Sequence, residues 1–266
     1  MDDNKYLGKT LAYSRFKLTT WKTESMLSLG VVGIDEKITN SYSGLLNKFD
    51  GIKGVPGPKP KDYKPQVSSE RMEDGDILVT LDDRAAAFLK KVLLNDKKRH
   101  DDLRFFLYSN IFVSVWGSFE TYTQMLFEEL LQKKPEMLKS KETMLLDDII
   151  THRNNIIPHL IERQVEAIGH FKIDDLLSYI NKKINVTLEP ADSKHIKDLY
   201  TIRNIIAHKS GLVRESQIKK IPAGVKVIGG ELRISEAYLK KMIKFMEKIV
   251  AMIERAVDDK FFHNDK

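Results

Sequence analysis

Apolar residues recur at spacings of three and four along much of this chain, and this periodicity limits its fold more than any other feature. In residues 101–134 and again in residues 235–257, one side of the segment is apolar and the other is charged. Stripes of this kind are typical of amphipathic helices packed in a bundle. Proline rarely interrupts them, because four of the chain's eight prolines lie between Gly51 and Pro65. The sequence therefore predicts a mainly α protein.

The last of these segments shows the pattern most clearly. Ser235 is the predicted N-cap of its helix. The residues predicted to face inward are Tyr238, Leu239, Met242, Ile243, Met246, Ile249, Val250 and Ile253. The lysines of this segment lie largely on the opposite side. We interpret the apolar face as core or as a contact between two subunits, and residues 116–131 offer a second face of the same kind.

The Pro/Gly-rich segment is the clearest boundary in the chain, since it cannot continue a helix or a sheet ladder. It predicts an N-terminal arm at residues 1–50, a linker at residues 51–68 and a helical domain at residues 69–266. We expect residues 1–65 to fold or move separately, so that their removal leaves a soluble helical core.

Shorter elements are predicted within the helical domain. Residues 76–81 read as a strand, after which Asp82 or Asp83 caps a helix over residues 84–96, separate from the one over residues 101–134. Alternating polar and apolar residues around Gly229–Gly230 predict a small β-hairpin inserted between helices.

Composition narrows the class of protein. The net charge is +6 and the pI is about 9.1, a balance that favours contact with a polyanion such as RNA. The chain has no cysteine, which excludes disulfides and thiolate chemistry. The polar start is unlike a signal peptide, and no apolar run approaches the ~20 residues of a membrane helix. We expect a cytoplasmic protein that does not contact a membrane.

The segment LYTIRNIIAHKSG, residues 199–211, carries the most chemistry. Pro190 is suited to the first turn of its helix and Gly211 to the position just past its end. Asn204 and His208 are four residues apart and share a face, and the long side chain of Arg203 reaches the same surface. The apolar stripe of this helix is expected to comprise Leu199, Ile202 and Ile206.

This trio is suited to cleaving a phosphodiester. An arginine binds phosphate by a charge-assisted fork, and a histidine takes or gives a proton near neutral pH. Arg203 would neutralise the phosphate, and His208 would act on the attacking hydroxyl or the leaving oxygen. The plainer alternative is that His208 caps the helix and Arg203 forms a surface ion pair.

The order Arg203-Asn204-x-x-x-His208 resembles the R-N-x-x-x-H motif of the HEPN superfamily. Upstream, SVWGSFETYTQMLFEELL resembles the aromatic and glutamate-bearing helix of prokaryotic HEPN families tied to RNA damage and phage defence. The resemblance covers roughly residues 80–257 and excludes the arm. It implies a HEPN-like helical bundle and a metal-independent endoribonuclease. In that family the RNA 2′-hydroxyl attacks the adjacent phosphate and leaves a 2′,3′-cyclic phosphate and a 5′-hydroxyl.

The resemblance also implies roles and partners. Arg203 would bind phosphate, His208 would be the catalytic histidine and Asn204 would orient them. The cleft would form where two copies meet, so we expect a homodimer, with the apolar contact drawn from residues 116–131 or from the final helix. A toxin-like or phage-defence effector would also have an antitoxin or regulatory protein as partner. Related toxins carry a tyrosine two residues after the histidine, where this chain has Ser210, so adenylylation there is in doubt.

Other residues leave alternatives open. Glu120 lies amid apolar residues and either pairs with Arg203 or reaches solvent. Arg153 and His159 form a second arginine–histidine pair, as an alternative site or part of an RNA groove, but Pro158 argues against one regular helix through both. We expect no metal and no other cofactor. The alternative function is a non-catalytic HEPN module that binds RNA, nucleotide or a protein, and a plain helical interaction protein is a third.

Overall fold

A computed structural model describes residues 10–38, 46, 62–64, 66–73, 77–138 and 146–262 of the chain. The described residues are mainly helical, which confirms the predicted class, and their strands form two small antiparallel hairpins. The chain divides into two compact units, which are described separately below. Unit 1 comprises residues 1–27 and 108–266, and unit 2 comprises residues 28–107. These bounds differ from those of the predicted arm, linker and domain.

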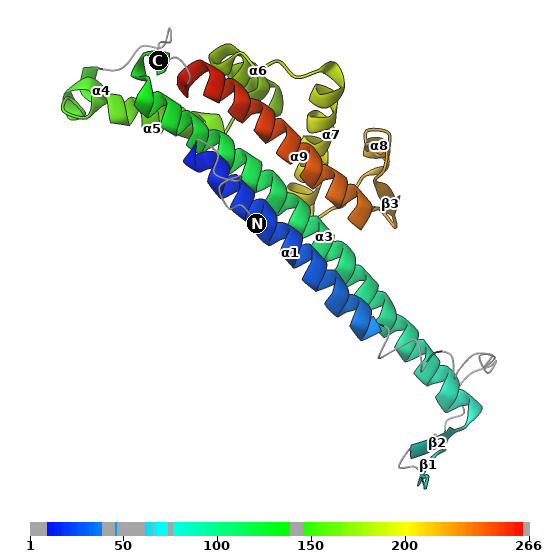
Figure 1. Ribbon diagram of the computed structural model, residues 1–266. Coiled ribbons are helices and arrows are strands. Elements are labelled where there is room, and N and C mark those ends of the chain that lie inside the picture. Colours follow the sequence, from blue (N-terminus) through cyan, green and yellow to red (C-terminus); the bar gives the residue numbers. More distant parts are fainter. Residues whose placement is uncertain are drawn as a thin grey trace. The chain divides into compact units, whose positions relative to one another are not determined.

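The elements follow one another as labelled in Figure 1. The helices are α1 (Leu11–Ile38), α3 (Asp83–Lys133), α4 (Leu146–Thr151), α5 (Ile156–Gly169), α6 (Ile173–Ile184), α7 (Pro190–Lys209), α8 (Glu215–Ile218) and α9 (Glu236–Val257). A 3₁₀ turn, η3 (Pro135–Leu138), follows α3, and a π-helical turn, η4 (Asp258–Phe262), follows α9. The strands are β1 (Val67–Arg71), β2 (Ile77–Leu81), β3 (Lys226–Ile228) and β4 (Glu231–Arg233). No helix among the described residues is long and apolar enough to cross a lipid bilayer.

Helix α3 is one continuous helix over residues 83–133, and the prediction of two helices is wrong. The interval between the two expected helices, residues 97–100, is strongly charged but contains neither glycine nor proline. Lysine and arginine are good helix formers, so nothing in this stretch ends the hydrogen-bond ladder.

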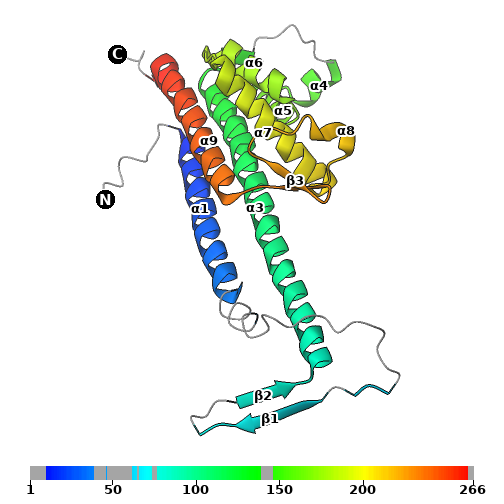
Figure 2. The same ribbon diagram turned by 90° about the vertical axis from the view of Figure 1, so that its right-hand side faces the viewer.

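The C-terminal part of α3 is the centre of unit 1. Its fully buried side chains include Phe112, Trp116, Phe119, Tyr122, Leu126, Phe127, Leu130 and Leu131. Figure 1 shows α3 running between α1 and α9, and in the view of Figure 2 α7 lies to the right of α3. Rings connect α3 to its neighbours, since Trp116 lies 5.7 Å from Tyr200 of α7 and Phe127 lies 4.8 Å from Tyr179 of α6, measured between ring centroids.

Helix α9 closes the same core. Ser235 caps it by accepting a hydrogen bond from the Tyr238 backbone N–H, as predicted. The inward face is confirmed except that Tyr238 is only half-buried. Because the apolar faces of α9 and of residues 116–131 are buried within the chain, neither is available as the dimer contact that the sequence suggested.

The first half of α1 belongs to unit 1. Ala12, Phe16 and Leu27 are buried. The Glu129 carboxylate of α3 accepts hydrogen bonds from the backbone N–H groups of Leu11 and Ala12, which are free donors at the start of α1. The expectation that residues 1–65 fold separately therefore does not hold for residues 10–27, because these residues complete the core.

Between α7 and α9 in the sequence, the chain forms a short two-stranded sheet. Strands β3 and β4 are antiparallel, and Ile228 pairs with Glu231, so that Gly229–Gly230 forms a two-residue turn. Both glycines have positive φ, the geometry that such a tight hairpin turn requires. The segment after α7 joins this hairpin through a bridge between Leu212 and Glu231. The predicted hairpin insertion is thus confirmed, and it holds the chain that leaves α7.

Unit 2 contains a second hairpin, in which Val67 pairs with Leu81 and Arg71 with Ile77. The predicted strand is β2, whereas β1 was missed because its sequence, VSSER, has no apolar alternation. Asp82 is the N-cap of α3 and accepts hydrogen bonds from the backbone N–H groups of residues 84 and 85. The hydrogen bond from the Tyr63 hydroxyl, together with those from the backbone, lowers the pKa of Asp82 to about 2. Most of the predicted linker, residues 51–61 and 65, lies outside the described residues.

Candidate functional site

Helix α7 carries Arg203, Asn204 and His208 at the edge of unit 1. Pro190 occupies its first turn, as predicted. The residues that anchor the helix in the core are Ile196, Leu199, Ile202 and Ile205. The expected third member, Ile206, is only half-buried, because the buried row advances by three residues at each step. The core thus fixes the helix, and the polar trio lies beside its buried face.

The end of α7 sets the position of His208. The helix ends at Lys209, Ser210 is left-handed with φ of 50°, and Gly211 follows with φ of 79°. The Gly211 N–H donates to the carbonyl of Ile205 at 3.1 Å, closing the helix end in the manner of a Schellman motif. His208 therefore lies in the last helical turn, where its side chain is exposed.

The Arg203 guanidinium joins the trio. Its Nη1 donates to the Asn204 Oδ1 at 3.1 Å and lies 3.3 Å from the His208 Nε2. A guanidinium has only donors, so the second contact is a hydrogen bond when Nε2 carries a lone pair and the imidazole proton is on Nδ1. This arrangement places the imidazole beside a fixed positive charge.

Glu120 of α3 holds the other end of the same guanidinium. Its Oε2 lies 3.3 Å from the Arg203 Nη2, and its Oε1 accepts a hydrogen bond of 2.8 Å from the Trp116 indole N–H. Of the two expectations for Glu120, the pairing with Arg203 is present. Trp116 is almost fully buried, so a rigid core residue orients the carboxylate that orients the arginine.

The Nε donor of Arg203 is unused in the described part of the chain. The side chain is 24% exposed, while its Nε is buried and makes no hydrogen bond to any described residue. A buried N–H without an acceptor is costly. A bound anion that shifts the guanidinium until this donor finds an acceptor would therefore stabilise the arginine.

A surface pocket of about 400 Å³ lies over the trio. Arg203, Asn204 and His208 line it together with Lys209, the next residue of α7, and with Lys220, which follows α8. Among the lining residues there is no carboxylate, so the pocket is cationic. The arrangement suits a phosphate group, with an imidazole at its edge to exchange a proton.

Sequence reasoning did not place Tyr200, Gln217 or Lys220 at this pocket. Tyr200 precedes Asn204 by one helical turn, so its place on this face was readable from the i, i+4 spacing. Gln217 of α8 and Lys220 reach the pocket only because the chain turns back after Gly211. No local signal in the sequence predicts that return.

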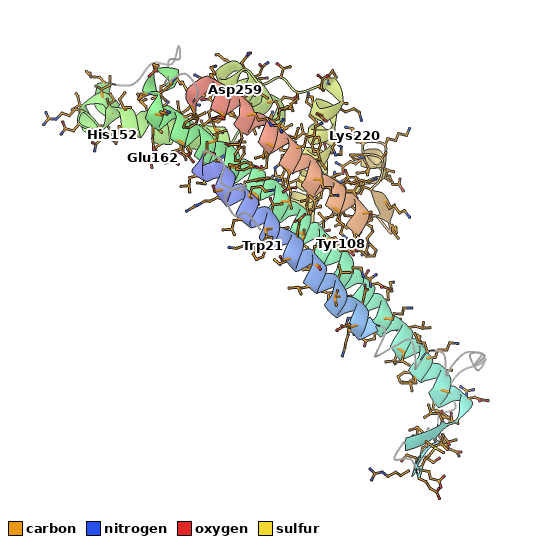
Figure 3. All side chains as sticks on the ribbon, in the orientation of Figure 1. Trp21, Tyr108, His152, Glu162, Lys220 and Asp259 are labelled. Carbon is orange, nitrogen blue, oxygen red and sulfur yellow. The ribbon has the colours of Figure 1, made fainter. Side chains whose placement is uncertain are left out.

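The second arginine–histidine pair lies elsewhere. Arg153 is exposed between α4 and α5, and no regular helix joins it to His159, as Pro158 suggested. The His159 ring stacks on that of His152, with 3.7 Å between ring centroids and 5° between planes. Figure 3 shows His152 and Lys220 at opposite ends of unit 1, so this pair does not contribute to the pocket around Arg203.

Acidic and histidine side chains do not converge on a metal-binding geometry in the described part of the chain, where no group of three or more was found. Comparison with family models, curated proteins and solved structures gives no match for this chain. A function assigned to it therefore rests on its own residues and their geometry.

Proposed function

We propose that this protein is a metal-independent endoribonuclease whose active site is the pocket around Arg203, Asn204 and His208. The observation that carries the proposal is the contact of 3.3 Å between the Arg203 guanidinium and the His208 Nε2, both of which line one cationic pocket. The resemblance of this trio to the HEPN motif supports the same assignment.

The proposed reaction needs no group beyond the protein and RNA. The His208 Nε2 takes the proton of the RNA 2′-hydroxyl, whose oxygen then bonds to the adjacent phosphorus. The bond from phosphorus to the 5′-oxygen breaks, and that oxygen receives a proton. Arg203 and Lys220 offset the charge that gathers on the phosphate oxygens. The products are a 2′,3′-cyclic phosphate and a 5′-hydroxyl.

Two proton transfers occur in this reaction, one at each oxygen. His208 beside Arg203 accounts for the proton transfer at the 2′-oxygen. The resemblance to HEPN proteins implies that the His208 of another copy accounts for the transfer at the 5′-oxygen. We therefore retain the homodimer as part of the proposal. A toxin-like or phage-defence role, controlled by an antitoxin or regulatory protein, follows from the same resemblance.

The test is cleavage of mixed RNA by the purified protein in EDTA, with identification of the new ends. We expect cyclic phosphate and 5′-hydroxyl ends from the wild type. Arg203→Ala and His208→Ala should each lower the rate at least about 100-fold, because each removes a group that acts in the transition state. Unchanged thermal unfolding should show that both variants stay folded.

Arg153→Ala and His159→Ala are the matched controls, because they remove the same residue types from the other pair. They should cut at the wild-type rate. If instead they lose activity while the Arg203 and His208 variants keep it, the site lies at the other pair. If the wild type binds RNA tightly but does not cut it, the proposed ribonuclease activity would be refuted and the non-catalytic HEPN module favoured.

A further inference from the structure

The positive charge of the chain is concentrated in one segment of α3, within unit 2. Residues 84–100 contain six lysine or arginine residues and one aspartate, so their net charge is +5, against +6 for the whole chain. Charge of one sign gathered along one helix is typical of a site for a polyanion. Figure 2 shows this half of α3 as one uninterrupted helix, so its side chains keep a fixed spacing.

The exposed cations of this segment lie on one face. Lys91, Lys98 and Arg99 are exposed, whereas the other lysines of the segment are half-buried. Arg84, Lys91 and Lys98 recur every seven residues, so at 3.6 residues per turn they stay within roughly 40° of one another. This row spans about 21 Å of helix, at 1.5 Å per residue, and Arg99 flanks it. These four residues are called the cationic face below.

The cationic face has no carboxylate partner among the described residues. Its three exposed members form no ion pair in the described part of the chain. The guanidinium of Arg84 lies 5.9 Å from the centre of the Tyr63 ring, a contact that does not neutralise its charge. The run of positive residues ends at Asp101 and Asp102. The charge of this face is therefore available to an external anion.

The cationic face points away from the part of α1 that belongs to unit 2. Arg104 forms an ion pair with Asp35, and the Leu107 side chain lies against Gly30. Positions 104 and 107 are rotated by roughly 140–160° from Lys91 about the helix axis. A ligand on the cationic face therefore does not compete with α1.

An aromatic ring lies on the same face. Phe88 is 69% exposed. It follows Arg84 by four residues and precedes Lys91 by three, so it lies beside both on the helix surface. Proteins bind single-stranded nucleic acid with this combination, because cations contact the phosphates and an exposed ring stacks on a base. In a duplex the bases are paired and stacked on one another, so the ring favours a single strand.

The exposed apolar side chains of this segment do not indicate a lipid surface instead. Leu89 and Leu94 are exposed as well, but they lie roughly 140° apart around the helix. A helix that lies on a membrane needs one broad apolar side. Here the exposed cations share a face and the exposed apolar side chains do not, which favours a polyanionic strand.

We propose that the cationic face and Phe88 bind single-stranded RNA, as a contact of unit 2 additional to the pocket around Arg203. The four cations bind phosphates of the strand, and one base stacks on the Phe88 ring. The choice of RNA over single-stranded DNA rests on the proposed function. The binding of a strand by this face does not depend on it.

The test is binding of a labelled 2′-O-methyl RNA strand of about 20 nucleotides to the full-length protein, followed by fluorescence anisotropy. This strand lacks the attacking 2′-hydroxyl, so it stays intact whether or not the protein cuts RNA. Lys91→Gln with Lys98→Gln should raise Kd about tenfold and lower the slope of log K against log salt by about 1.4, because two phosphate contacts are lost. Lys241→Gln with Lys244→Gln, which removes two exposed lysines of α9, should change neither.

A second pair of variants tests the ring. Phe88→Ala should raise Kd about tenfold through the loss of base stacking, whereas Phe88→Tyr should keep the wild-type value because the ring face remains. Equal Kd values for Phe88→Ala and the wild type would overturn the stacking contact.

A wild type that does not bind the strand, or equal Kd values for the two double lysine variants, would overturn the proposal. Binding to phosphatidylserine vesicles in place of the strand, lost in the Lys91→Gln and Lys98→Gln protein, would overturn RNA as the ligand. If the wild type cuts RNA while the two double variants bind the strand equally, this proposal fails and the proposed function stands. If binding follows the cationic face and no RNA is cut, the reverse holds.

Discussion

The side chain of Glu120 connects the core to the candidate site. It accepts a hydrogen bond from the buried Trp116 indole and pairs with Arg203, which in turn contacts His208. These contacts limit the rotamers of an arginine that would otherwise be free at a helix surface. In the proposed reaction Glu120 would therefore be a positioning residue that acts through Arg203.

Replacement of Glu120 by glutamine tests this role. The amide keeps the size of the side chain and an acceptor for Trp116, but it removes the charge that holds the guanidinium. We expect kcat for RNA cleavage to fall about tenfold, with a smaller change in KM, because a misplaced catalytic group costs rate more than binding. Glu128→Gln, an exposed change on the same helix, is the control. Equal rates for both variants would refute the assignment.

At the scale of the element, the end of α7 decides where His208 lies. The helix closes through Gly211, whose φ of 79° is strained for any residue with a side chain. A Cβ added there would meet no atom within 4 Å, so the cost of substitution is conformational rather than steric. The fold of the site thus depends on a residue that makes no contact in the pocket.

Gly211→Ala should lower the free energy of unfolding by about 1 kcal/mol, the cost of a left-handed conformation for an L-residue. It should also lower the cleavage rate, because the last turn of α7 would rearrange around His208. Gly33→Ala is a suitable control, since its added Cβ also meets nothing and Gly33 lies inside α1 with ordinary φ. Urea denaturation and the RNA assay measure the two effects. A variant as stable and active as the wild type would show that the helix end does not set the site.

At the scale of the whole molecule, residues 10–27 are integral to unit 1. The Thr10 hydroxyl and the Tyr122 hydroxyl both donate to the Glu254 Oε1 of α9, each at 2.8 Å. Burial raises the pKa of this glutamate. The ring of Phe16 lies 5.8 Å from that of Tyr122, between centroids, and is only 2% exposed. Residues far apart in sequence therefore share one core.

Phe16→Ala should lower the free energy of unfolding by about 3–5 kcal/mol, the usual cost of deleting a buried phenylalanine. Trp21→Ala is the matched control on the same helix, because Trp21 is 63% exposed; it should change stability by no more than about 0.5 kcal/mol. Urea denaturation of both variants measures the difference. Equal stabilities would mean that α1 packs loosely and that residues 10–27 are dispensable after all.

The sequence by itself determined the features that depend on local interactions. The apolar row of α9, its Ser235 cap and the Gly229–Gly230 turn depend on neighbours within a few residues, so periodicity and turn chemistry predicted them. The grouping of Arg203, Asn204 and His208 could be predicted for the same reason, because one helical turn brings these residues together.

Contacts across the chain were decided only by the tertiary structure. Glu120 and Arg203 are 83 residues apart, and Thr10 and Glu254 are 244 apart. The periodicity of a helix shows which face is apolar but not which partner covers it. Packing joins residues that are far apart in the sequence. It buries the first half of α1 against α3, brings Lys220 to the pocket and covers the two apolar faces that were expected to form the dimer contact.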